Sequence, residues 1–289
     1  MPPGAIMHKW LTGPLSVEQL TVPIRDLPVH LSGVRLTQLT DFHYDGLCLS
    51  DWLLQEAIAA SNAANPDLVV LTGDYVTDAP EWIHALVPWL KRLQSRHGVY
   101  AVLGNHDNYR RRSRHKITHA LTNAGIHVLW NQIAYPFGTD LPLVGLSDYW
   151  TPGFQPDPVM QQLAPSTPRI VLSHNPDSAT ALHSWRVDLQ LSGHSHGGQI
   201  FLPGIGLLPA KLAELYPQLP SSFRHHLPIL RTCYRTVQTW AWAQGFHRVG
   251  KNALYVNRGL GSYPPGRLFC PPEVTVITLT RRSSQGGDA

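Results

Sequence analysis

Seven residues of the types that bind metal ions stand in five short polar turns along this chain. The turns read DFH, TGD, GNHD, SHN and GHSH, and their metal-binding side chains are those of Asp41, His43, Asp74, Asn105, His174, His194 and His196. Carboxylate, amide and imidazole ligands suit Mn²⁺, Fe²⁺ and Zn²⁺. Because no thiolate belongs to the set, a structural zinc site is disfavoured.

The number of these side chains predicts two divalent metal ions. Seven ligands are too many for one transition-metal ion with open positions, but they suit two ions that share a ligand. Asp74 is the only such residue in its turn, so we expect its carboxylate to bridge the ions. Two divalent ions would leave the site positively charged, which favours a phosphate group. A metal-bound water can reach a pKa near 7, so we expect a bridging hydroxide to attack phosphorus in a phosphoester.

Each turn follows a short apolar run that predicts a β-strand. These runs cover residues 34–40, 68–71, 99–103, 169–172 and 189–191, and helical spacing covers 51–64, 81–96 and 113–123. An edge strand is expected at 16–24, and further strands at 126–130, 141–146, 199–202, 253–256 and 274–279. The alternation indicates an α/β fold. Since ligands collect beyond the carboxyl ends of strands in such sheets, the five turns should converge on one site.

In this order, the motifs DFH, LTGD, GNHD, SH and GHSH resemble the calcineurin-like metallophosphoesterase superfamily. The segments GGQIFLPG, YVNRGLG and CPPEVTVITL resemble a narrower bacterial group of membrane-associated or exported phosphoesterases. The relatives of that group include UDP-2,3-diacylglucosamine pyrophosphatases. The resemblance covers roughly residues 31–280. It implies a four-layer αββα sandwich, in which two sheets lie face to face with helices outside.

The resemblance also implies a role for each site residue. One metal ion would take Asp41, His43, Asp74 and His196, and the other would take Asp74, Asn105, His174 and His194. His106 would contact the substrate phosphate, either protonating the leaving oxygen or stabilising charge, and Asp107 would orient His106. In an extended segment residues i and i+2 point the same way, so His194 and His196 would reach neighbouring ions. Mn²⁺ is the expected ion, with Zn²⁺ and iron as alternatives.

One domain is expected over residues 1–280, followed by a disordered tail at 281–289. Residues 204–248 depart from the narrower group and are expected to form a cap or insertion, in which apolar and aromatic residues alternate with arginines. This segment either adds packing over the sandwich or presents an apolar face. Such a face would hold acyl chains or dip into a membrane surface.

The charge pattern bears on the partners of the protein. The net charge is +4, which suggests mild attraction to anions. The basic tract at residues 110–116 runs into a predicted helix start, where positive charge opposes the helix dipole. It is either a solvated face or a site for a phosphate, a nucleotide or an acidic lipid headgroup. We expect a phosphorylated small molecule or a nucleotide-linked lipid as substrate. No stable nucleic-acid partner is expected, because extended basic, aromatic-rich strands are absent from the sequence.

Localisation and the competing functions follow from the remaining features. The chain has three cysteines without paired spacing, no recognisable signal peptide and no apolar run near the roughly 20 residues of a membrane span. A cytoplasmic enzyme is therefore expected, with peripheral attachment to the inner membrane as the alternative. The main interpretation is a dinuclear phosphoester hydrolase, and a UDP-2,3-diacylglucosamine pyrophosphatase is its more specific form. A non-catalytic metal-binding scaffold is disfavoured, because none of the motif residues is missing.

Overall fold

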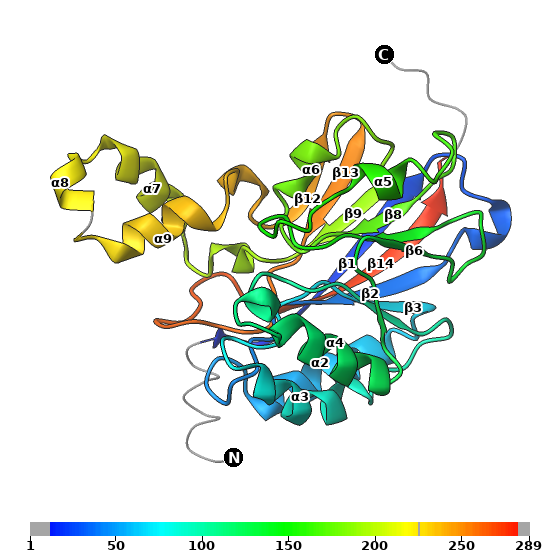
Figure 1. Ribbon diagram of the computed structural model, residues 1–289, viewed down its shortest axis with the longest axis horizontal. Helices are drawn as coiled ribbons and strands as arrows, with labels where there is room; N and C mark the ends of the chain where they lie inside the picture. The colour runs from blue at the N-terminus through cyan, green and yellow to red at the C-terminus, as the bar shows by residue number, and fades with distance from the viewer. Residues whose placement is uncertain (1–11, 225, 283–289) are drawn as a thin grey trace.

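Two six-stranded sheets lie face to face in the computed structural model, which describes residues 12–224 and 226–282 (Figure 1). The first sheet has the order β1 (Ser16–Ile24), β14 (Glu273–Arg281), β2 (Arg35–Leu39), β3 (Leu68–Leu71), β4 (Val99–Ala101) and β5 (His127–Val128). The second has the order β12 (Gly245–Val249), β13 (Asn252–Val256), β9 (Leu189–Ser192), β8 (Ile170–Leu172), β7 (Leu143–Gly145) and β6 (Gln132–Ala134). The strands β2, β3 and β4 are parallel, as are β7, β8, β9 and β13.

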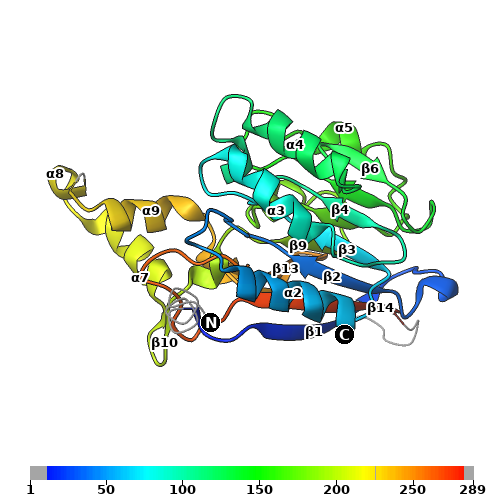
Figure 2. The same ribbon diagram turned by 90° about the horizontal axis from the view of Figure 1, so that it is seen from below.

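Helices cover the outer face of each sheet. Beside the first sheet lie α2 (Asp51–Ala63), α3 (Ile83–Leu90) and α4 (Ser113–Asn123), and beside the second lie α5 (Asp157–Met160) and α6 (Ser178–Ala181) (Figures 1 and 2). The prediction of an αββα sandwich is therefore confirmed. Helix α3 is shorter than the helix predicted over residues 81–96. Beyond Leu90, the side chain of Asn62 donates to the Arg92 carbonyl and accepts the Gln94 N–H, so these backbone groups are not used in a helix.

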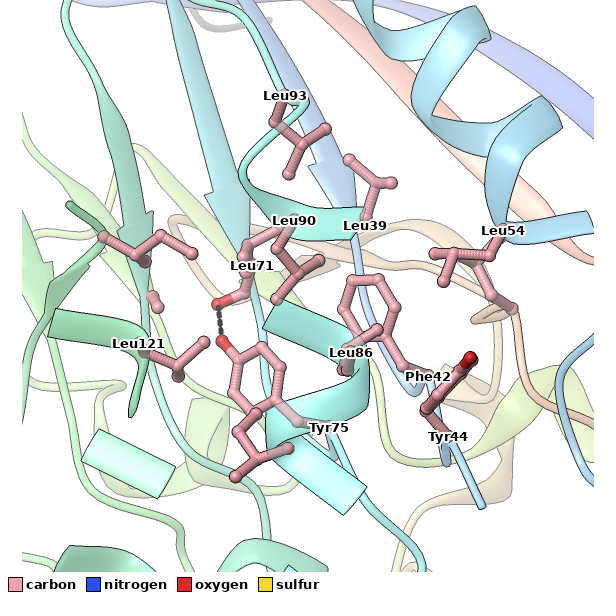
Figure 3. Close-up of a cluster of buried hydrophobic side chains, with 14 of the residues drawn as sticks. Leu39, Phe42, Tyr44, Leu54, Leu71, Tyr75, Leu86, Leu90, Leu93 and Leu121 are labelled. Carbon is pink, nitrogen blue, oxygen red and sulfur yellow. Dashed lines mark hydrogen bonds between the residues drawn. The ribbon is translucent and has the colours of Figure 1, made fainter. Parts of the chain in front are cut away.

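Alternating side chains along the strands fill three apolar layers. On β3, Val69 and Leu71 join the cluster under the first set of helices, part of which Figure 3 shows. Leu68 and Val70 of the same strand face the layer between the two sheets. Within the first cluster, the Tyr75 hydroxyl donates to the Leu71 carbonyl at 3.4 Å. Because both faces of the strands are buried, the runs read as continuously apolar.

The segment after β9 extends from the sandwich as an arm (Figures 1 and 2). It contains β10 (Phe201–Leu202), β11 (Gly206–Leu207), α7 (Leu208–Leu215), α8 (Ser221–Arg224) and α9 (Pro228–Thr236), along with the 3₁₀ turns η5 (Tyr216–Gln218) and η6 (Trp240–Trp242). The helices α7 and α9 pack against each other. We call residues 205–243 the cap. The predicted boundary at 248 was too late, since β12 pairs with β13 and belongs to the second sheet.

The two ends of the chain complete the description. Arg281, placed in the predicted disordered tail, is instead the last residue of β14 and pairs with Ile24. Residues 283–289 of that tail lie outside the described residues, as do residues 1–11. Within the described part of the chain, no helix combines the length and the apolar character needed to cross a membrane.

Candidate metal centre

The five predicted turns meet at the carboxyl ends of the parallel strands, where hydrogen bonds join them. The Asp41 N–H donates to the Gly73 carbonyl at 2.9 Å, and the Gly193 N–H donates to the His174 carbonyl at 2.9 Å. The two sheets are joined by the His194 N–H, which donates to the Asp41 carboxylate at 3.0 Å. The predicted convergence of the turns is therefore confirmed.

Two trios of predicted ligands bring their nitrogen and oxygen atoms together. Within each trio these atoms lie within 4.8 Å of one another, and the trios are Asp41, His43, His196 and Asp74, His174, His194. His106 forms a further group of the same size with His43 and Asp74. Asn105 joins the second trio through its Oδ1, 3.2 Å from His174 Nε2. All seven predicted ligands thus lie in one cluster. His194 and His196 belong to different trios, as the resemblance implies.

Each of the four clustered imidazoles uses one ring nitrogen for a bond that leads away from the cluster. The partners are Thr72 O for His174 Nδ1 at 2.7 Å, Thr236 O for His194 Nε2 at 2.6 Å, Gly261 O for His196 Nδ1 at 3.1 Å and Tyr263 Oη for His43 Nδ1 at 2.8 Å. In His174, His194 and His196 the partner is a carbonyl, which only accepts, so the nitrogen that contacts it carries a hydrogen and the opposite nitrogen faces the cluster. This is the arrangement of histidines that ligate metals, and the donor set fits divalent ions.

Five of the seven clustered residues have backbone torsions in the left-handed region. Their φ angles are 52° for Asp41, 43° for His43, 54° for Asp74, 71° for His194 and 53° for His196. The expectation of an extended segment at 194–196 was therefore wrong, since β9 ends at Ser192 and a turn follows. Such torsions cost of order 1 kcal/mol or more each and concentrate at functional sites.

Two glycines leave room for the carboxylates of the cluster. A Cβ on Gly193 would lie 2.2 Å from Asp41 Oδ2, and a Cβ on Gly104 would lie 2.2 Å from Asp74 Oδ1. Neither glycine has a positive φ, so these positions require glycine for space. The glycines of the GNHD and GHSH turns thereby let the backbone approach the two acidic side chains closely.

The structure corrects the expectation that Asp107 orients His106. The Asp107 carboxylate accepts the backbone N–H groups of Asp74, Tyr75 and Gly104 at 2.9–3.0 Å. His106 Nδ1 instead contacts the Thr77 carbonyl at 2.6 Å. Burial and the Asp74 charge raise the pKa of Asp107, while the N–H groups oppose that rise. Asp107 therefore fixes the backbone of two turns and does not contact the imidazole.

Electrostatics keep the two carboxylates ionised and two histidines neutral. Burial alone would raise the pKa of Asp41, but the His196 and His43 imidazoles hold it well below its usual range. Burial lowers the pKa of His194 to about 4 and that of His196 to about 3. Both rings are therefore neutral at pH 7, which is the protonation state that binds a metal ion.

Further residues of this region were missed by the sequence interpretation. Tyr263 lies beside His43, and the loop that carries it has no metal-ligand motif. Burial and the Asp74 charge raise its pKa above the usual range, so its hydroxyl keeps its hydrogen. Asp148 follows β7 in a polar turn, a signal that could have identified it. It is fully buried, its Oδ1 has no hydrogen-bond partner among the described residues, and burial raises its pKa to about 6.

Comparison with known proteins agrees with this geometry. The family model described as calcineurin-like phosphoesterase matches residues 34–198. Phosphodiesterase YaeI of Escherichia coli is 34% identical over 246 residues, which cover 83% of this chain and 80% of that protein. The uncharacterised metallophosphoesterase YkuE of Bacillus subtilis is 30% identical over 88% of this chain and 81% of that protein. UDP-2,3-diacylglucosamine pyrophosphatase LpxG of Chlamydia muridarum is 28% identical over 86% of this chain and 84% of that protein.

Ordered turns that carry carboxylates, an amide and imidazoles, set at the strand ends of an αββα sandwich, agree with these matches. The predicted superfamily and the prediction of an enzyme are both confirmed. This chain therefore belongs to the calcineurin-like phosphoesterase family of metal-dependent phosphoester hydrolases.

Proposed function

We propose that this protein hydrolyses phosphoesters at a dinuclear metal centre. The ligands would be Asp41, His43, Asp74, Asn105, His174, His194 and His196. The observation that carries the proposal is the set of hydrogen bonds that point one nitrogen of each clustered imidazole outward. These bonds leave the opposite ring nitrogens facing two carboxylates and one amide oxygen, a set of mixed ligands that suits Mn²⁺, Zn²⁺ or iron.

Asp74 would be the shared ligand. Its Oδ2 lies 3.5 Å from His43 Nε2 and 3.0 Å from His174 Nε2, so one oxygen faces both trios. Its other oxygen accepts the His106 N–H at 2.9 Å, which fixes the orientation of the carboxylate. Two divalent ions held there would polarise the phosphoryl oxygens and lower the pKa of a coordinated water that attacks phosphorus.

His106 would contact the substrate phosphate through Nε2. Its Nδ1 is occupied by the Thr77 carbonyl, so Nε2 is the ring nitrogen left for a substrate. Burial lowers the pKa of His106, despite the nearby Asp74 charge. When a phosphate binds and the ring takes up a proton on Nε2, the imidazolium would stabilise charge on the phosphate or give that proton to the leaving oxygen.

Substitution of the proposed ligands tests this function. Asp74→Ala and Asn105→Ala should each abolish hydrolysis of bis(p-nitrophenyl) phosphate while the far-UV circular dichroism spectrum stays close to wild type. Elemental analysis of the purified wild type should find one to two equivalents of transition metal, with Mn²⁺ expected first. Chelation should remove the metal and the activity together. Wild-type rates in either variant would reject the assignment.

A cavity in the cap favours a more specific substrate, a nucleotide-linked lipid pyrophosphate such as UDP-2,3-diacylglucosamine. The cavity has a volume of about 950 Å³, and its lining includes Trp150, Ala213, Tyr234, Arg235, Val237 and Trp240. Thr236, whose carbonyl contacts His194, lies between two of these residues. The cavity therefore lies in the cap near the segment that contacts His194, and it offers a mostly apolar surface to an acyl chain. Exposed arginines at 110–112 offer positive charge to a nucleotide.

Filling the cavity tests the substrate. Ala213→Leu adds three carbon atoms to the cavity wall, where Ala213 is 7% exposed. The variant should lose turnover of UDP-2,3-diacylglucosamine and keep turnover of bis(p-nitrophenyl) phosphate, because the small ester does not need the cavity. The wild type should also release product from the lipid faster than from soluble UDP-sugars. Equal loss on both substrates would contradict the cavity as an acyl site.

We further propose that α9 brings the enzyme to an anionic membrane surface as a peripheral protein. Ile229 and Tyr234 are 68% and 49% exposed on this helix, and Arg231 and Arg235 are exposed beside them. Apolar side chains and arginines on one short helix suit the boundary of an anionic bilayer. Sedimentation with phosphatidylglycerol vesicles should fall in an Ile229→Asp, Arg231→Glu variant. Unchanged sedimentation would reject this contact.

A further inference from the structure

The Tyr263 hydroxyl lies beside two histidines of the site. Its Oη is 2.8 Å from His43 Nδ1 and 3.5 Å from His106 Nε2. The Tyr263 ring also lies near the rings of His43 and His196, with centroids 4.9 and 5.4 Å away. The side chain is half-buried, so it borders both the cluster and the solvent. Its hydroxyl therefore lies at the edge of the cluster.

The loop that carries His196 fixes the position of Tyr263. The Tyr263 N–H donates to Gln199 Oε1 at 2.7 Å, and the Tyr263 carbonyl accepts the Gly266 N–H at 2.8 Å. Nearby, the Arg267 guanidinium donates to the Gly261 carbonyl at 2.7 Å. With its backbone bonded on both sides, Tyr263 presents its hydroxyl from a preorganised position.

Among the described residues, the hydrogen of this hydroxyl is offered only a long contact, to His106 Nε2 at 3.5 Å. His43 Nε2 lies 3.0 Å from His196 Nε2 and 3.5 Å from Asp74 Oδ2, so it faces the cluster. A nitrogen that binds a metal ion there needs its lone pair, and the hydrogen of the ring must then sit on Nδ1. His43 Nδ1 consequently donates to Tyr263 Oη, and the hydroxyl keeps its own hydrogen for another acceptor.

The ring nitrogens of His106 can be assigned in the same way. Its Nδ1 donates to the Thr77 carbonyl, so Nε2 donates to a phosphate oxygen in the protonated ring. The Tyr263 Oη and His106 Nε2 atoms are 3.5 Å apart. One oxygen atom can therefore lie within a hydrogen-bond distance of about 2.8 Å from both.

We propose that Tyr263 is a further catalytic residue, whose hydroxyl donates a hydrogen bond to the phosphate oxygen that His106 also contacts. The inference rests on the proposed function, because it takes the site to bind a phosphoester. The hydroxyl keeps its proton throughout and acts only as a donor. Its contribution comes from a fixed dipole directed at an oxygen that carries negative charge.

Binding of inorganic phosphate to the Mn²⁺-saturated protein tests this role without turnover. By isothermal titration calorimetry, Tyr263→Phe should weaken phosphate binding about tenfold, as expected for the loss of a hydrogen bond to a charged group. The variant should keep the wild-type number of bound Mn²⁺ ions. The Tyr263→Phe, His106→Ala double variant should lose less than the product of the single losses, because both side chains contact the same oxygen. Tyr100→Phe, which removes a hydroxyl from β4, serves as the control and should bind phosphate as the wild type does.

Two outcomes would overturn the proposal. If Tyr263→Phe binds phosphate normally and only its Mn²⁺ affinity falls, Tyr263 acts through His43 alone. If phosphate binding is weak in the wild type and unchanged in the variant, the contact does not exist. The proposed function is judged separately by wild-type turnover of bis(p-nitrophenyl) phosphate. If the wild type turns over bis(p-nitrophenyl) phosphate but Tyr263→Phe binds phosphate as the wild type does, this inference is overturned and the proposed function stands.

Discussion

His194 Nε2 lies 2.6 Å from the backbone carbonyl oxygen of Thr236, the last residue of α9. This bond joins the cap directly to a side chain of the candidate metal centre. The chain that follows is anchored by the Asp177 carboxylate, which accepts the N–H groups of Gln238 and Thr239 at 2.7 and 3.1 Å. The position of the cap and the orientation of the His194 ring are therefore coupled.

Removing the Asp177 carboxylate should lower the metal affinity of one of the two sites. In Asp177→Ala the segment after Thr236 loses two hydrogen bonds, so the carbonyl no longer holds the His194 ring as firmly. Loss of such a supporting contact lowers metal affinity by about 10-fold to 100-fold. Titration of the metal-free protein with Mn²⁺ should show this loss for one of the two ions. Asp177→Asn, which keeps an acceptor oxygen, should lose less, and equal affinities in all three proteins would contradict the coupling.

Alanine at Gly193 or Gly104 should displace a proposed ligand while the fold persists. The new Cβ would press on the Asp41 carboxylate in the first variant and on the Asp74 carboxylate in the second. A displacement of about 1 Å at a catalytic site can cost about 100-fold in rate. We expect that loss in turnover of bis(p-nitrophenyl) phosphate, along with fewer bound metal equivalents by elemental analysis.

A matched control separates crowding at the site from general damage. Gly125, unlike Gly193 and Gly104, has open space around its Cβ position, with no atom within 4 Å, although its φ is +84°. Gly125→Ala should therefore strain the backbone locally and leave both turnover and metal content near wild type. If it lost as much activity as Gly193→Ala, crowding of the carboxylate would not be the cause.

The sandwich and the cluster were predictable because they follow local rules. Apolar runs such as 68–71 mark strands, and polar residues directly after them must lie at the same edge of a parallel sheet. Seven residues could thus be placed together before their distances were known. The short elements β6, α5 and α6 escaped prediction, since three or four residues carry no measurable period.

The parts that could not be predicted depend on contacts between distant segments. Tyr263 meets His43 across 220 residues, and Asp107 faces backbone groups of Asp74 and Tyr75 more than 30 residues away. The family resemblance assigned Asp107 to His106, its neighbour in the chain. Only the folded backbone shows that the N–H groups of two turns point at that carboxylate.

Asp107 and His106 should differ sharply in what their removal damages. Asp107→Ala leaves three buried N–H groups without their acceptor, which should lower the free energy of unfolding by about 3 kcal/mol. His106→Ala removes one bond to the Thr77 carbonyl and should lower it much less. Urea denaturation measures the first effect, and turnover of bis(p-nitrophenyl) phosphate measures the loss in His106→Ala. Similar unfolding midpoints for both variants would contradict the structural role of Asp107.

Asp148 should make the metal-free protein less stable at neutral pH than at acidic pH. Burial raises its pKa from 3.8 to about 6, so the folded state binds the proton more tightly than the unfolded chain does. The resulting stability is present below pH 3.8 and is lost as the pH rises through 6. Asp148→Asn cannot ionise and should escape this loss. Its advantage over wild type should grow by about 1 kcal/mol between pH 5 and pH 8.

Urea denaturation of chelator-treated protein at these two pH values measures the difference. Asp140→Asn changes an exposed carboxyl group in the same way and should show no such growth with pH. Because Asp148 Oδ1 has no hydrogen-bond partner among the described residues, the charge on this carboxylate is poorly compensated, and an amide removes that charge at little steric cost. An advantage of Asp148→Asn that stays constant from pH 5 to pH 8 would show that the Asp148 carboxyl does not titrate in this range.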